Sequence, residues 1–132
     1  MAISYVSSGT GTNSIASMPS HQAGDLLIFF AYRDGSTTNP TLPAGFTSIT
    51  APDGTSSSTT VGYKIAASGS ETSGTWTNAT SLICHVYRSS SGSVFPGAVA
   101  TNTGSSTTVN YPALTLNNTG GSSWVLGFAG CN

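Results

Sequence analysis

The stretch Leu26-Leu-Ile-Phe-Phe-Ala-Tyr32 is the longest unbroken apolar run in the chain, and it decides the fold. Turn-forming residues bound it on both sides, with Gly24-Asp25 before it and Asp34-Gly35 after it. A short continuous apolar run that contains aromatic residues and lies between turns is typical of a strand buried on both faces. We therefore predict a β-strand over these residues, at the centre of its sheet.

Alternating segments later in the chain predict the neighbours of this strand. Val61, Tyr63 and Ile65 alternate with smaller or more polar residues, which is the period-two pattern of a half-buried strand. The segment Leu82–Tyr87 alternates in the same way, so its even-numbered residues face one side and its odd-numbered residues face the other. We expect Cys84 on the core side, as a small hydrophobic residue.

Shorter apolar stretches between turn-forming residues supply the remaining predicted strands. They are Ile3–Val6, Phe46–Thr50, Val94–Ala100, Val109–Tyr111, Ala113–Leu116 and Trp124–Ala129. No window of a dozen residues has apolar residues at helical spacing. The prediction is a single all-β domain over residues 1–132, an antiparallel β-sandwich or jelly roll with eight or nine short strands and little or no helix.

The low charge content excludes several classes of function. Only 5% of the 132 residues are charged, against about 25% in ordinary soluble domains, and the formal net charge is −1. A nucleic-acid-binding protein needs a basic surface that neutralises phosphates, and this chain has none. The same scarcity of charged groups argues against acid–base catalysis, so we expect no enzyme activity.

The residue types that carry catalysis or bind metals all have structural interpretations here. Asp25 lies in a turn context, where Asp bonds its own backbone, and Glu71 lies in a Ser/Thr-rich loop. His21 precedes a Gly-Asp turn and is predicted to be a surface loop residue. His85 follows Cys84 in a strand, so the two point to opposite faces and cannot readily share a metal. We predict no catalytic residue, metal or cofactor.

We expect no targeting or membrane-spanning segment in this sequence. The run Leu26–Tyr32 is far shorter than the ~20 residues that a membrane helix needs. The N-terminus lacks the basic and apolar regions of a signal peptide, so we expect synthesis and assembly in the cytoplasm. Two cysteines, Cys84 and Cys131, make no disulfide framework, and we expect no bond between them.

Several longer segments occur in an order that resembles a known group of proteins. They are Ala23–Gly35, Pro43–Phe46, Gly62–Ala66, Glu71–Trp76, Cys84–Arg88 and Ser123–Phe128. In this order they resemble small virion structural proteins of tailed bacteriophages and prophages, from about residue 20 to the end of the chain. The resemblance implies a virion location and no catalytic residues. Relatives continue beyond the last segment, so the sandwich is expected to be completed by a neighbouring subunit or to be naturally short.

The resemblance leaves two positions on the particle open. An outer capsid decoration or cement protein would bind copies of itself, with a trimer among the options, and the major capsid protein. A tail-fibre or tail-tip component would bind the host surface, where a glycan is a candidate partner. The chain has no sequence typical of a fibre shaft, which favours decoration. From a different class, a carbohydrate-binding module is the second alternative, with Trp76 in its polar segment as the stacking residue.

The predicted functional residues form an interface rather than a catalytic site. The contact loops are Gly35–Pro43, Thr55–Thr60 and Ser89–Ser93, and the candidate interface residues are Trp76, Phe95, Arg33 and Arg88. Trp76 and Phe95 are candidate anchors because each is an aromatic residue in a loop-like stretch. Edge strands without charged residues are open to pairing with another chain, so we expect sheet extension or strand exchange between subunits.

Overall fold

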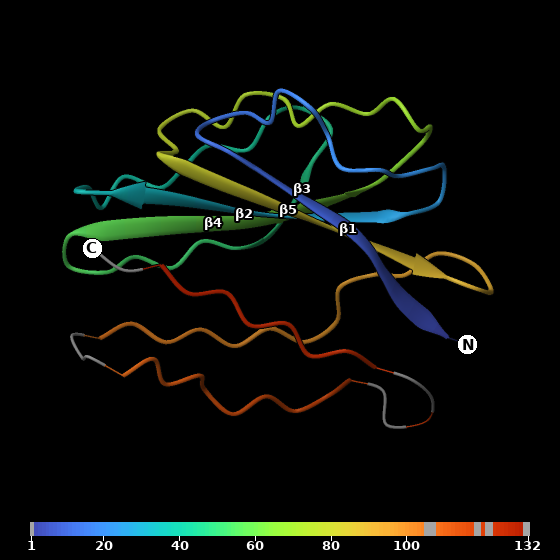
Figure 1. Cartoon of the computed structure of the whole chain (residues 1–132). Helices are drawn as coiled ribbons and strands as arrows, with labels where there is room; N and C mark the ends of the chain where they lie inside the picture. Colours follow the sequence, from blue (N-terminus) through green and yellow to red (C-terminus); the bar gives the residue numbers. More distant parts are fainter. Residues whose placement is uncertain (1, 105–107, 118–119, 121–122, 131–132) are drawn as a thin grey trace.

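The protein folds around a single antiparallel sheet of five strands, shown in Figure 1. The computed structural model describes residues 2–104, 108–117, 120 and 123–130, and these residues contain no helix, hence none that could cross a membrane. The strands are β1 (Ile3–Gly11), β2 (Leu26–Asp34), β3 (Thr47–Thr50), β4 (Ser57–Ile65) and β5 (Ser81–Ser89). Their order across the sheet is β1-β5-β2-β4-β3.

The central position of β2 confirms the prediction from the long apolar run. It pairs with β4 on one side and β5 on the other, so that Phe29 lies between Gly62 and Cys84. Every residue from Leu26 to Tyr32 is buried. Odd-numbered residues of β2 face one side of the sheet and even-numbered residues face the other. Because both sides are covered, the run contains no polar residue.

Loops cover one face of the sheet and enclose the main core. Leu27 and Phe29 of β2 pack there with Leu82, Cys84 and Val86 of β5, as the alternation predicted. The covering chain comes from the segments between β1 and β2, between β2 and β3, and between β4 and β5, which arch over this face in Figure 1. They contribute the buried or partly buried residues Ile15, Met18, Leu42, Phe46, Ala66, Trp76 and Ala79.

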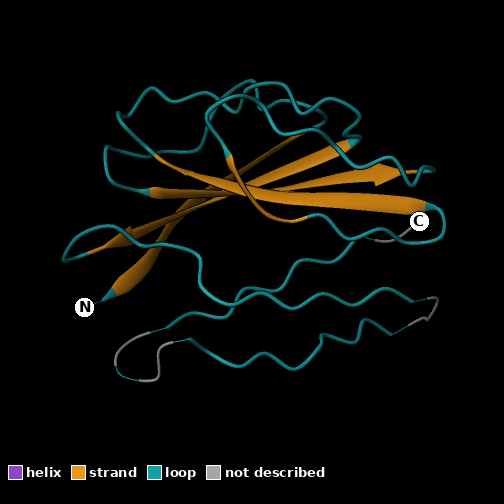
Figure 2. Cartoon of the chain, turned by 180° about the vertical axis from the view of Figure 1, so that it is seen from behind, coloured by secondary structure: helices purple, strands orange, loops and turns teal. Residues whose placement is uncertain are grey.

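The opposite face of the sheet is covered by the end of the chain. Residues 94–104, 108–117 and 123–130 run beneath it as extended segments, and we call them the C-terminal layer (Figures 1 and 2). Val94, Leu126 and Phe128 of this layer pack against the second apolar cluster of the sheet, which includes Phe30 and Tyr87. Phe128 stacks on Phe30 with ring centroids 5.3 Å apart.

The C-terminal layer has the alternation of strands but not their hydrogen-bonded ladders. Around Leu126 and Phe128 the partly buried residues alternate with exposed ones, and the same alternation runs through residues 94–99 and 111–115. No strand occurs in the described part of this layer, although four were predicted there. The fold is therefore all-β and antiparallel, as expected, but the described residues contain five strands rather than eight or nine.

Candidate assembly and binding surfaces

Trp76 belongs to the core, so the prediction of an exposed anchor or sugar platform at this residue is wrong. Its side chain is fully buried, stacks on Phe29 with centroids 5.7 Å apart, and meets the ring of Phe46 edge-on. The indole Nε1 donates a hydrogen bond to the carbonyl of Ser73 at 3.0 Å. Gly62 on β4 leaves room for the indole, because a Cβ there would lie 3.0 Å from it.

Arg88, one of the predicted interface residues, makes an ion pair within the chain and stays partly exposed. Its Nε and Nη2 donate to the two carboxylate oxygens of Asp25, each at 2.7 Å. Asp25 is 1% exposed and also accepts a hydrogen bond from the backbone N–H of Gln22. The hydrogen bond from Arg88 lowers the pKa of Asp25, against the opposing effect of burial. The pair ties the end of β5 to the turn before β2.

Arg33 and Phe95 remain candidates for contact with a partner. Arg33 is half-buried near the end of β2, opposite Ser58 of β4, and makes no ion pair within the part of the chain that the structure describes. Phe95 is 63% exposed and points outward from the start of the C-terminal layer. The exposed ring of Phe95 would gain free energy from the removal of its apolar surface from water at an interface.

The three predicted contact loops differ in the structure. Gly35–Pro43 is a loop as predicted, but it folds onto the core, where the carbonyl of Pro40 accepts a hydrogen bond from Thr60 Oγ1 at 2.7 Å. Thr55–Thr60 was predicted to be a loop, yet β4 begins at Ser57. The residues after Ser89, the last residue of β5, are an exposed loop up to Ser93 and stay available for contact.

A hydrogen bond between His21 and Glu71 joins the loop between β1 and β2 to the loop between β4 and β5. The backbone N–H of Glu71 donates to Nε2 of His21 at 3.0 Å, so Nδ1 carries the proton and donates to the carbonyl of Pro19 at 2.6 Å. The Glu71 carboxylate accepts from Lys64 and from the backbone N–H of Ala67, and the hydrogen bond from Lys64 lowers its pKa. His21 and Glu71 therefore have structural roles.

Cys84 and His85 lie on opposite faces of the sheet, as predicted for adjacent strand residues. Cys84 is a free, buried thiol in the main core, and burial raises its pKa to about 12. His85 lies among aromatic rings on the other face, where burial lowers its pKa. Cys131 lies outside the described residues. Among the described residues, no group of three or more His, Cys, Asp or Glu side chains comes together.

Strand β1 presents an open edge of the sheet. It pairs with β5 on one side, and no strand of the described chain pairs with its other side. Its nine residues, Ile3–Gly11, include no charged side chain, and Ser4, Tyr5, Ser8 and Thr10 are exposed. The opposite edge, β3, has only four residues and an irregular register, which makes it a poorer template for pairing.

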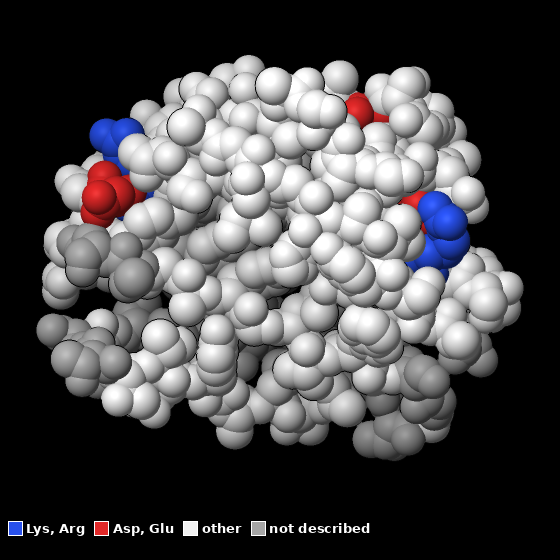
Figure 3. All heavy atoms as spheres, in the orientation of Figure 1, with Lys and Arg blue, Asp and Glu red and all other residues white. Residues whose placement is uncertain are grey.

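The C-terminal layer carries large exposed apolar side chains. They are Phe95, Val99, Val109, Tyr111, Leu116, Trp124 and Val125, each at least 39% exposed. Few charged side chains accompany them, and most of the face in Figure 3 carries none. Contiguous exposed apolar patches are typical of surfaces that contact other molecules.

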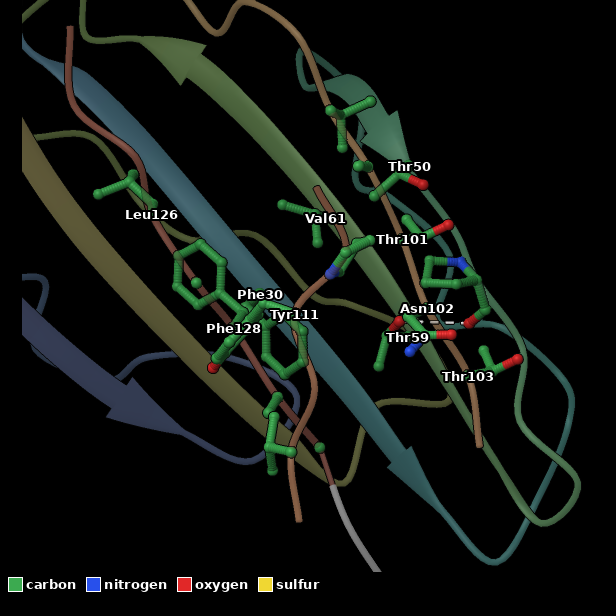
Figure 4. Close-up of a pocket in the computed structure, with 18 of the residues that line it drawn as sticks. Phe30, Thr50, Thr59, Val61, Thr101, Asn102, Thr103, Tyr111, Leu126 and Phe128 are labelled. Atoms are coloured by element: carbon green, nitrogen blue, oxygen red, sulfur yellow. Dashed lines mark hydrogen bonds between the residues drawn. The ribbon is translucent and has the colours of Figure 1, made fainter. Parts of the chain in front are cut away.

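A cavity of about 560 Å³ lies between the sheet and the C-terminal layer. Figure 4 shows Phe30 and Val61 on its sheet side, with Tyr111, Leu126 and Phe128 opposite them. Its polar lining includes Thr50, Thr59, Thr101, Asn102 and Thr103. None of its lining residues, all of which the structure describes, is charged. Its volume falls within the roughly 300–1,000 Å³ typical of ligand sites.

Aromatic residues gather where β1 and β5 meet the C-terminal layer, and we call them the aromatic cluster. Tyr87 lies at its centre, with Tyr5 and Trp124 edge-on to it at centroid distances of 5.9 Å and 5.7 Å. His85 Nδ1 lies 3.2 Å from the Tyr87 hydroxyl, and its ring lies 5.5 Å from that of Phe128. Trp124 and Phe128 also line the cavity, so the cluster and the cavity are contiguous.

Tyr5 and His85 were not predicted from the sequence as residues of a candidate binding surface. Tyr5 stands directly opposite Tyr87 in the β1–β5 ladder, a pairing that needs the register of strands about eighty residues apart. Trp124, which begins the last predicted strand, is 49% exposed.

No protein-family model, curated protein or solved structure matches this chain.

Proposed function

We propose that this protein is a virion structural protein of a tailed bacteriophage, an outer capsid decoration or cement protein that assembles with copies of itself on the shell. The observation that carries the proposal is the open, uncharged edge of β1. The order of sequence segments from Ala23–Gly35 to Ser123–Phe128 supports the viral setting.

The edge of β1 is suited to sheet extension. Soluble proteins protect such edges with charged residues, proline or strong bulges, because unpaired N–H and C=O groups recruit other strands. β1 has a single register shift, between Tyr5 and Ser7, and the remaining residues continue in regular register from Ser7 to Gly11. A second copy that adds its own β1 here would gain main-chain hydrogen bonds without having to desolvate a charged side chain.

The proposal extends to a second sheet formed from the C-terminal layer. Its segments are already extended and alternate between inward and outward residues, so ladder formation needs small adjustments rather than refolding. Contact with a neighbouring copy through Phe95, Val99 and Val125 would press these segments together and remove the exposed apolar area. The assembled protein would then be the β-sandwich that the sequence predicts, with a trimer among the possible oligomers.

The major capsid protein is the proposed partner on the shell, and a tail-fibre or tail-tip role is the alternative. The two positions differ in copy number. Quantitative mass spectrometry of purified virions should give a ratio to the major capsid protein near one, or a simple fraction of it. A ratio near one in a hundred would place the protein on the tail, and absence from the particle would overturn both assignments.

A charge placed on β1 tests the assembly mechanism. In sedimentation velocity at micromolar concentration, we expect the wild type to be oligomeric and Ser8→Lys to be shifted toward monomer, because the ammonium group disfavours edge pairing. Thr72→Lys is the matched control, since Thr72 is exposed in the loop between β4 and β5 and belongs to no strand. A monomeric wild type, or equal behaviour of both variants, would contradict the proposal.

A further inference from the structure

We propose that the aromatic cluster and the adjoining cavity form a binding site for a neutral oligosaccharide. This inference goes beyond the proposed assembly function and does not depend on it. It rests on the arrangement of Tyr5, Tyr87 and Trp124, on the polar groups beside them, and on the absence of charge from the cluster and the cavity lining.

The aromatic cluster combines one buried ring with two exposed rings. Tyr87 is 4% exposed, while Tyr5 and Trp124 are 48% and 49% exposed and each meets the Tyr87 ring edge-on. Each exposed ring can therefore offer a face to a ligand. Because Tyr and Trp have few rotatable bonds, they lose little conformational entropy when a ligand packs on them. Pyranose rings present an apolar C–H face that suits such stacking.

Polar groups lie next to the rings, where sugar hydroxyl groups would need them. The Tyr87 hydroxyl can both donate and accept, and His85 Nδ1 uses only part of that capacity. Farther along, the cavity presents the hydroxyl groups of Thr50, Thr59 and Thr101 at its sheet and layer sides. Apolar stacking surface next to hydroxyl and amide groups matches the mixed character of a saccharide better than that of a hydrocarbon ligand.

The lack of charge selects a neutral ligand. Burial lowers the pKa of His85 and raises the pKa of Tyr87, so both side chains are uncharged at neutral pH. Arg88, the next residue along β5, directs its charge to Asp25 on the other side of the sheet. A sialylated or phosphorylated sugar would find no cation in this site to offset the loss of hydration.

The two tryptophans allow a direct test. Trp76 is fully buried and Trp124 is half-exposed, so a ligand at the site should change the emission of Trp124 only. The probes are neutral hexasaccharides of glucose, galactose, mannose and N-acetylglucosamine, titrated against the intact chain. We expect a saturable change with at least one of them, and no change with sialyllactose. Failure of all four neutral probes, or binding of sialyllactose alone, would overturn the proposal.

Variants assign the binding to the cluster. Tyr5→Ala should weaken binding about tenfold or more, as expected when a stacking residue worth more than about 1.4 kcal/mol is removed. Phe95→Ala is the matched control, because Phe95 is also aromatic and exposed but lies outside the cluster, and it should bind as the wild type does. Trp124→Phe should abolish the fluorescence signal while calorimetry still detects binding.

Sedimentation of the same samples separates this site from the assembly surface. Tyr5→Ala should lose saccharide binding and keep the oligomeric state of the wild type, whereas Ser8→Lys should keep binding and lose assembly. If Tyr5→Ala binds the saccharide normally, the site is wrongly placed. If it dissociates the oligomer without affecting a saccharide, the cluster is a subunit interface and the proposal fails.

Discussion

At the scale of single residues, Asp25 gives the clearest case of a polar group fixed by its partners. The carboxylate is buried and ionised because Arg88 and the backbone N–H of Gln22 hydrogen-bond to it. These contacts lower its pKa in the folded state. The turn context in the sequence predicted the bond to the backbone, but the ion pair joins residues 63 positions apart and has no local signal.

The pH dependence of stability follows from this lowered pKa. The unfolded chain binds a proton at Asp25 at a higher pH than the folded protein does, so the stabilisation is complete above the unfolded pKa of about 3.9. It is lost as the pH falls through the folded pKa. In urea unfolding, Asp25→Asn should cost about 2 kcal/mol at pH 7 and flatten the decline in stability below pH 4. An unchanged acid dependence would show that other carboxylates, such as Glu71, dominate it.

Packing, rather than an unusual backbone conformation, requires a glycine at position 62. A Cβ at this position would lie 2.8 Å from Leu42 Cδ2 and 3.0 Å from the Trp76 ring. Gly62→Ala should therefore overpack the core and lower the free energy of unfolding by about 1–3 kcal/mol. Gly97→Ala is the control, since its nearest neighbour would lie 3.9 Å away, and it should change stability little. Equal effects of the two would mean that the core around Trp76 relaxes freely.

At the scale of elements, local composition predicts where the strands lie, but it does not predict whether an isolated residue in a loop is buried. Every residue of the apolar run in β2 is suited to burial, whichever face of the sheet it points to. The central position of β2 could therefore be predicted from that run alone. Trp76 is flanked by exposed polar residues, and its burial depends on Phe29 and Gly62, which come from other strands. Ser57–Thr60 resembles a turn-rich tract, yet tertiary pairing with β2 makes it a strand.

The C-terminal layer is held to the sheet by its inward side chains rather than by hydrogen-bonded ladders. Phe128→Ala should remove the stacking on Phe30 and reduce the free energy of unfolding by about 2–3 kcal/mol, less than for a fully buried Phe. Thr115→Ala, at an exposed position of the same layer and outside the proposed subunit contact, should stay within about 0.5 kcal/mol. Chemical denaturation of the two variants at equal concentration measures the difference, and equal losses would show that the layer packs differently.

At the scale of the whole molecule, the few charges are mostly satisfied within the chain. Lys64 pairs with Glu71 and Arg88 pairs with Asp25, which leaves Arg33, Asp34 and Asp53 outside the ion pairs of the described residues. The low charge content was evident from the composition, but the composition could not show which charged residues pair with one another. A protein whose surface offers hydroxyl groups and apolar side chains has little charge for salt to screen.

The proposed assembly should therefore be insensitive to ionic strength. Contacts through main-chain hydrogen bonds at β1 and apolar side chains such as Phe95 contain no ion pair, so the oligomer should keep its sedimentation coefficient from about 0.05 to 1 M salt, while the Debye length falls to about 3 Å. Dissociation at high salt would instead implicate Arg33, and Arg33→Gln would then reproduce it at low salt. Persistence at high salt together with loss in Ser8→Lys would place the contact at the strand edge.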